Sequence, residues 1–145
     1  MRNLRKGELE RGQVLVDFAL AVTVMLAVIF GICNFGLALY TYDLVTSAAQ
    51  IGGRYAIVHG SSCTLSGCPA SAAAIQTYVL SKVSGVNKSQ LTVTTTWSTA
   101  SGCTDSNFQG PQCIVNVKVQ YPFQFFLSFN RTLNMTSTSQ MVISQ

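Results

Sequence analysis

The feature that most constrains this chain is an apolar segment near its N-terminus. Residues 18–42 form a run of 25 residues without a charge, and its strongly polar members are Thr23, Asn34 and Thr41. A helix of this length spans about 37 Å, which exceeds the ~30 Å hydrocarbon core of a bilayer. Because the run is apolar on every side, it is not an amphipathic surface helix. It predicts one membrane-spanning helix, with Tyr40 and Tyr42 at the far interface.

The charges around this run predict its orientation. Four of the nine Lys and Arg residues precede it, and Arg54 is the first cation after it. The positive-inside rule then puts the N-terminus in the cytoplasm and the remainder outside. A cleaved secretory signal is the alternative, but its apolar core is usually about 7–15 residues long and is followed by a small-residue cleavage site. Neither property fits residues 18–42.

Composition limits the functions open to the rest of the chain. Only 10% of the 145 residues are charged, against about 25% in an ordinary soluble domain. From Asp43 onward the acids are Asp43 and Asp105, and the one histidine is His59. No nucleophile, phosphate-loop or metal motif surrounds them, and the cations there are scattered singly. We therefore expect no enzymatic activity, no cofactor, no metal and no nucleic-acid partner.

Beyond the membrane, the periodicity predicts an α+β head. Apolar residues at helical spacing extend the first helix from Val14 to about His59, with Gly52-Gly53 weakening it and favouring a bend. A second helix is expected from Pro69 to about Ser84. Alternating residues then predict strands at 91–97, 114–121 and 132–144, joined as an antiparallel meander. Pro122 ends the second strand or lies at a sheet edge.

An aromatic cluster follows the second predicted strand. Its simplest interpretation is core packing or a cap on the sheet, and contact with a partner or a membrane is the alternative. The cluster consists of Phe123, Phe125, Phe126, Leu127 and Phe129.

Five cysteines divide into one within the apolar run and four beyond it. Cys33 lies in the run and is interpreted as a small packing residue. The four others, Cys63, Cys68, Cys103 and Cys113, suit disulfides in a translocated domain and allow three pairings. We favour Cys63–Cys68 and Cys103–Cys113, because each pair closes a local loop between predicted elements. Zinc is the competitor, but neither spacing is CxxC and histidine is scarce.

Three sequence blocks in about the first 58 residues carry a family resemblance. They are residues 10–20, ERGQVLVDFAL, residues 35–40, FGLALY, and residues 48–56, AAQIGGRYA. Together they resemble TadE-like proteins, the pilin-like subunits of tight-adherence pili. That family usually has Glu where this chain has Asp17, and Arg where it has Leu37.

The resemblance implies class III prepilin-like processing. A membrane prepilin peptidase would cut after Gly12 and leave Gln13 as the new N-terminus. Asp17 and Phe18 would then belong to the assembly region, where the family acid is understood to pair with the N-terminal amine of a neighbouring subunit. Pairing within one chain is also open, because one helical turn separates Gln13 from Asp17. Without the resemblance, Asp17 would be an interfacial carboxylate at the lipid headgroups.

These inferences combine into a pilin-like plan of three parts. Residues 1–12 are a leader, 13–60 a transmembrane and assembly helix, and 61–145 an extracytoplasmic head. We expect a structural minor pilin or pseudopilin of a bacterial inner membrane that reaches the cell surface on assembly. Its expected partners are the prepilin peptidase, other pilin subunits, the tight-adherence machinery and the membrane. The alternative is an unprocessed single-pass membrane protein whose outer domain binds a partner.

Overall fold

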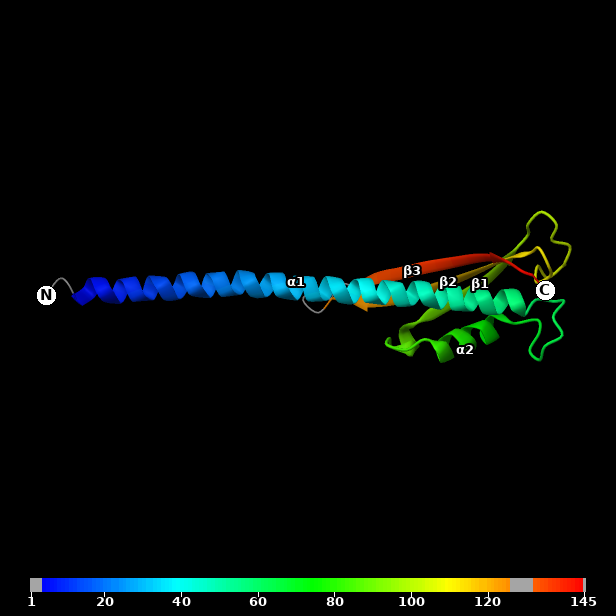
Figure 1. Ribbon diagram of the computed structural model, residues 1–145, viewed down its shortest axis with the longest axis horizontal. Coiled ribbons are helices and arrows are strands. Elements are labelled where there is room, and N and C mark those ends of the chain that lie inside the picture. The colour runs from blue at the N-terminus through cyan, green and yellow to red at the C-terminus, as the bar shows by residue number, and fades with distance from the viewer. Residues whose placement is uncertain (1–3, 126–131, 145) are drawn as a thin grey trace. The chain divides into compact units, whose positions relative to one another are not determined.

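The computed structural model describes residues 4–125 and 132–144 (Figure 1). Its elements in chain order are α1 (Leu4–Val58), α2 (Ala72–Lys82), the short 3₁₀ helix η1 (Lys88–Gln90), β1 (Thr92–Ser98), β2 (Ile114–Gln124) and β3 (Thr132–Val142). The chain divides into two compact units, Met1–Leu37 and Ala38–Gln145, and α1 contributes to both. The predicted α+β class, with a long N-terminal helix, a second helix and a three-stranded antiparallel sheet, is confirmed.

The first unit is the N-terminal part of α1. The helix begins at Leu4, ten residues before the predicted start at Val14. Most residues between these positions are Leu, Arg, Lys, Glu or Gln, which are strong helix formers and need no tertiary contact to favour a helix. From Gly12 to Cys33, nearly every side chain is exposed.

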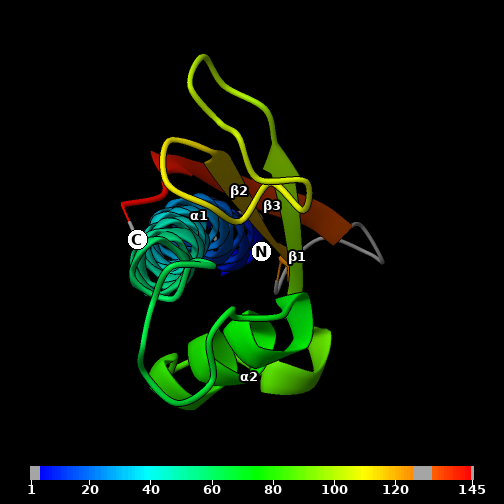
Figure 2. The same cartoon turned by 90° about the vertical axis from the view of Figure 1, so that its right-hand side faces the viewer.

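The second unit has a buried core that the C-terminal part of α1, α2 and the sheet share (Figure 2). Ile75 and Val79 of α2 and Val117 of β2 are each 0% exposed. On α1, the buried residues between positions 48 and 56 are small, which lets the sheet and α2 approach the helix backbone closely. They are Ala48, Ala49, Gly52, Gly53 and Ala56.

The two adjacent glycines of α1 lie at the tightest of these contacts. A Cβ on Gly52 would lie 2.8 Å from Cγ1 of Val117 and 3.0 Å from Cγ2 of Val79. A Cβ on Gly53 would lie 3.0 Å from Oγ of Ser139. The sequence favoured a bend here, but the helix continues through both positions. The cost of glycine in a helix is offset by the close packing it permits.

The second helix begins later than the sequence predicted. Pro69 follows a cis peptide bond and precedes the helix, rather than occupying its first turn. Ser71 is the N-cap, and its Oγ accepts a hydrogen bond of 3.2 Å from the backbone N–H of Ala74. The hydroxyl thereby satisfies one of the free N–H groups of the first turn. The helix ends at Lys82, because Val83 has an extended backbone.

The three strands form the predicted antiparallel meander in the order β1-β2-β3. Valines of β2 at positions 115, 117 and 119 point into the core, and Lys118 between them is exposed. Pro122 lies within β2 and is paired with Asn134 of β3. The pairing of β2 with β1 stops at Gln120, so Pro122 lies where β2 has become an edge. A missing N–H is tolerated at an edge, which accounts for a strand that continues to Gln124.

Part of the predicted aromatic cluster belongs to the core. Phe123 is 9% exposed and meets Phe125 edge to face, with ring centroids 5.1 Å apart. This geometry is a favourable one for aromatic pairs. The remaining members, Phe126, Leu127 and Phe129, lie outside the described residues.

Candidate assembly surface and head pocket

The four residues predicted for processing and assembly lie near the start of the described side chains. Gly12, Gln13, Asp17 and Phe18 are all helical and exposed, and a Cβ on Gly12 would meet nothing within 4 Å. Gln13 and Asp17 are four residues apart and so share a helix face. Among the side chains that the structure describes, Asp17 has no ion-pair partner. The carboxylate is therefore open to a group from outside this chain.

Next to these residues, α1 carries a continuous apolar surface that the protein does not bury. Phe18 is 69% exposed, Val24 64% and Ile32 68%. Within Gly12–Val58 the helix includes a stretch long and apolar enough to cross a membrane, and none of that stretch is buried. Apolar surface left in water costs about 25 cal/mol per Å². This surface therefore favours an apolar environment, which the described residues do not provide.

Two polar side chains of this stretch form hydrogen bonds to the helix that carries them. The hydroxyl of Thr23 donates to the carbonyl of Ala19 at 2.8 Å, and Nδ2 of Asn34 donates to the carbonyl of Phe30 at 3.0 Å. Such bonds to the preceding turn remove the need for water. An unsatisfied polar group in hydrocarbon costs roughly several kcal/mol. Because these two side chains bond within their own helix, they are compatible with lipid or with packing against other helices.

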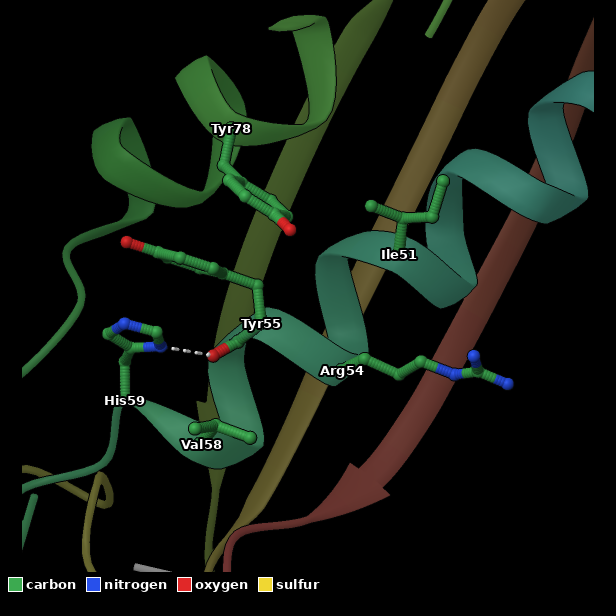
Figure 3. A pocket seen from close by; sticks show the side chains of 6 residues that line it. All are labelled: Ile51, Arg54, Tyr55, Val58, His59 and Tyr78. Carbon is green, nitrogen blue, oxygen red and sulfur yellow. Dashed lines mark hydrogen bonds between the residues drawn. The ribbon is translucent and has the colours of Figure 1, made fainter. Parts of the chain in front are cut away.

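A pocket of about 400 Å³ lies beside the C-terminal end of α1 (Figure 3). Three of its rings stack in series. The Tyr55 ring lies 4.0 Å from His59 and 4.2 Å from Tyr78, centroid to centroid. Nδ1 of His59 is also hydrogen-bonded to the carbonyl of Tyr55 at 3.0 Å. The stack joins the end of α1 to α2. The pocket is lined by Ile51, Arg54, Tyr55, Val58, His59 and Tyr78.

Sequence reasoning did not predict this stack. The helical spacing of this segment served only to predict that the first helix extends to about His59. The spacing of four between two rings on one helix was the available signal, since such residues are neighbours on the helix surface. The third ring, Tyr78, comes from another element, and nothing in the local sequence pairs it with Tyr55.

The polar residues of the head hold its loops. The carboxylate of Asp105 accepts hydrogen bonds from the backbone N–H groups of Asn107 and Gln109, at 3.3 and 3.0 Å. Within residues 4–125 and 132–144, no three His, Cys, Asp or Glu side chains gather where they could hold a metal ion. Asp105 therefore acts as a turn-forming residue.

The cysteines form two local disulfides. Cys63 is bonded to Cys68, with Cα atoms 5.9 Å apart, and Cys103 to Cys113, with Cα atoms 4.6 Å apart. These are the pairs that the loop argument favours. The second disulfide closes the base of the loop between β1 and β2. Cys33 of α1 is free and exposed.

Comparison with known proteins finds a similarity within helix α1. The family model described as TadE-like protein matches residues 12–54. No curated protein and no solved structure matches the chain. The matched segment begins at Gly12 and stays within α1, so the resemblance inferred from the sequence is confirmed there. The TadE-like pilus family is structural rather than enzymatic, and the chain is similar to it over residues 12–54.

Proposed function

We propose that this protein is a minor pilin or pseudopilin of a tight-adherence pilus or secretion machine. The observation that carries the proposal is the TadE-like match over residues 12–54. That segment contains the apolar surface of α1 that the chain leaves exposed. The helix of a pilin-like subunit has an apolar environment in both of its states. It lies in lipid before assembly and against other subunits afterwards.

Processing by a prepilin peptidase is the first step of this function. The enzyme cuts after Gly12, so that residues 1–12 are a leader, 13–60 the assembly helix and 61–145 the head. Exposure of Gly12, with no group within 4 Å of the place its Cβ would occupy, supports access to this peptide bond. The partners are the peptidase, other pilin subunits, the assembly machinery and the membrane.

Asp17 guides assembly once Gln13 carries the new N-terminus. A carboxylate in an apolar bundle is costly unless an opposite charge pairs with it. The amine of Gln13 on a neighbouring subunit provides that charge in a bundle of parallel helices. The exposure of Asp17 and the absence of an ion-pair partner among the described side chains support this role.

The head lies outside the cytoplasm in this proposal. Four cations in residues 1–12 favour a cytoplasmic N-terminus. The two disulfides of the head support the same orientation, because disulfides persist mainly in oxidising compartments.

Gel mobility in cells with and without active prepilin peptidase tests the processing step. The wild-type protein is expected to lose twelve residues only when the peptidase is active, and Gly12→Val is expected to block this loss. Gly31→Val is the matched control, because Gly31 is also an open helical position with nothing near its Cβ site. Equal mobility in both cell types would favour an unprocessed, membrane-anchored protein.

The role of Asp17 is tested separately from processing. Asp17→Ala is expected to be processed and yet to be missing from purified pili, whereas Asp17→Glu keeps the charge and is expected to assemble. Normal amounts of Asp17→Ala in pili would contradict the assembly role while leaving processing intact.

A further inference from the structure

Within the head unit, α1 has two opposite faces. The buried face consists of positions 41, 45, 48, 49, 52, 53 and 56, and it packs on the head core. The opposite face carries four exposed polar residues at helical spacing, Asp43, Ser47, Gln50 and Arg54. Steps of four, three and four residues keep them in one stripe along the helix. This polar stripe therefore points away from the core that holds the head together.

Two unpartnered charges of opposite sign mark the ends of this stripe. In the described part of the chain, neither Asp43 nor Arg54 has an ion-pair partner. The Arg54 guanidinium points away from the stacked rings of Tyr55, His59 and Tyr78 (Figure 3). The two charges are eleven residues apart, which places their Cα atoms about 16 Å apart along the helix and within about 20° around it. They are too distant to pair with each other within one chain.

We infer that this stripe binds the same stripe of a second copy of the chain, parallel and displaced by about 16 Å, with Asp43 of one copy paired to Arg54 of the other. The stripe is complementary to itself because it carries one charge of each sign. The inference rests on the proposed function, since anchoring in one membrane makes neighbouring helices parallel. An antiparallel pair would also match the charges, but it would need opposite membrane orientations.

The displacement has a consequence for assembly. Each contact between two parallel copies uses Arg54 of one and Asp43 of the other, and leaves one unmatched charge on each. Both copies use the same helix face in this contact, so the contact specifies a pair of displaced copies and does not by itself extend to further copies. The stripe thus specifies an axial offset between the head units of two copies.

Cysteine cross-linking of the full-length protein in membranes tests this offset without touching the charges. Ser47 and Val58 are both exposed and are also eleven residues apart, so the proposed offset brings Ser47 of one copy beside Val58 of the other. The reporter is Ser47→Cys with Val58→Cys, in a Cys33→Ser background that removes the free thiol. The probe is a short bismaleimide. The double variant is expected to give several-fold more cross-linked product than either single variant.

The single variants distinguish other arrangements. Copies in register would link Ser47→Cys to itself, so strong cross-linking of that single variant would overturn the proposed offset. An antiparallel pair centred on the two charges would bring Ser47 beside Gln50 and keep it away from Val58. Failure of the double variant to exceed the single variants would likewise overturn the proposal.

Charge reversal on the reporter background tests the pair itself. Asp43→Lys and Arg54→Glu are each expected to reduce the cross-linked product several-fold, and the two together are expected to restore it. Lys118→Glu is the matched control, because Lys118 is an exposed cation on β2 and its reversal is expected to change nothing. No recovery in the combined variant would overturn the pairing of Asp43 with Arg54.

The same gel separates this inference from the proposed function, because it also reports the mobility shift of processing. A processed protein without Ser47–Val58 cross-links would overturn the stripe and leave the proposed function standing. Cross-links in an unprocessed protein would support the stripe and contradict the processing.

Discussion

The two units of this chain treat the same residue types in opposite ways. Ile32 in the first unit is 68% exposed, whereas Ile75 in the second is 0% exposed. Val24 and Val117 differ in the same manner, at 64% and 0%. The head therefore buries its apolar residues within one chain, while the N-terminal helix leaves its own for an environment outside the chain. Stability of the head is thus carried by residues other than those to which we assign the proposed assembly.

Truncating one isoleucine in each unit gives the sharpest form of this comparison. Ile75→Ala is expected to lower the free energy of unfolding of the head by about 2–5 kcal/mol, because it leaves a cavity between α2 and α1. Ile32→Ala is expected to change it by less than about 0.5 kcal/mol. Denaturant unfolding in detergent, followed by the fluorescence of Trp97, measures both. Equal losses would show that the helix surface stabilises the head.

The cysteines allow a second comparison. Cys103→Ala with Cys113→Ala opens a loop with a sequence separation of 10 and is expected to cost about 3 kcal/mol of head stability. The pair Cys63→Ala with Cys68→Ala opens a shorter loop, with a separation of 5, and is expected to cost about 2 kcal/mol. Cys33→Ala on the helix is the control and is expected to leave the same denaturation midpoint unchanged. A larger loss for the shorter loop would contradict this explanation from loop entropy.

Glycine substitutions are also expected to affect the two units differently. Gly52→Ala is expected to destabilise the head by about 1–3 kcal/mol, because the added Cβ overpacks a filled core. Gly31→Ala adds its Cβ to open space and removes a weak helix former, so the head should melt at the same temperature as in the wild-type protein. A thermal melt of each variant measures the difference. If Gly52→Ala raised the melting temperature, close packing would not explain why glycine occupies position 52.

The smallest expected effect is a gain in the stability of the head. Oγ1 of Thr95 is buried without a hydrogen-bond partner among the described residues, whereas Oγ1 of Thr23 donates to the carbonyl of Ala19. Thr95→Val is therefore expected to stabilise the head by about 1 kcal/mol, since it removes an unsatisfied hydroxyl without changing the volume. Thr23→Val is expected to leave head stability unchanged. A loss of stability in Thr95→Val would indicate a bound water at that hydroxyl.

Much of the fold was predictable because its elements follow local patterns. The long helix and the three strands show clear periods in the sequence, and the strand order follows from the tendency of consecutive strands to pair. The start of α2 was missed because Ser71 competes with Pro69 as a starting signal, and the cap hydrogen bond decides between them. The continuation of β2 past Pro122 depends on where β1 stops pairing, which the sequence of β2 alone does not contain.

The candidate site residues also divide into those with a local sequence signal and those that meet only in the fold. The local disulfide pairs were favoured because each closes a short loop between predicted elements. The stack of Tyr55, His59 and Tyr78 and the packing of Gly52 involve two or three elements that meet only in the fold. Tertiary contacts of this kind leave no periodic trace in the sequence.

The most direct test of the account is the N-terminal sequence of the protein extracted from membranes of cells with active prepilin peptidase. We predict that the chain begins at Gln13, which would give Asp17 the position that assembly requires. An intact N-terminus at Met1 in those cells would contradict the processing on which the proposed function depends.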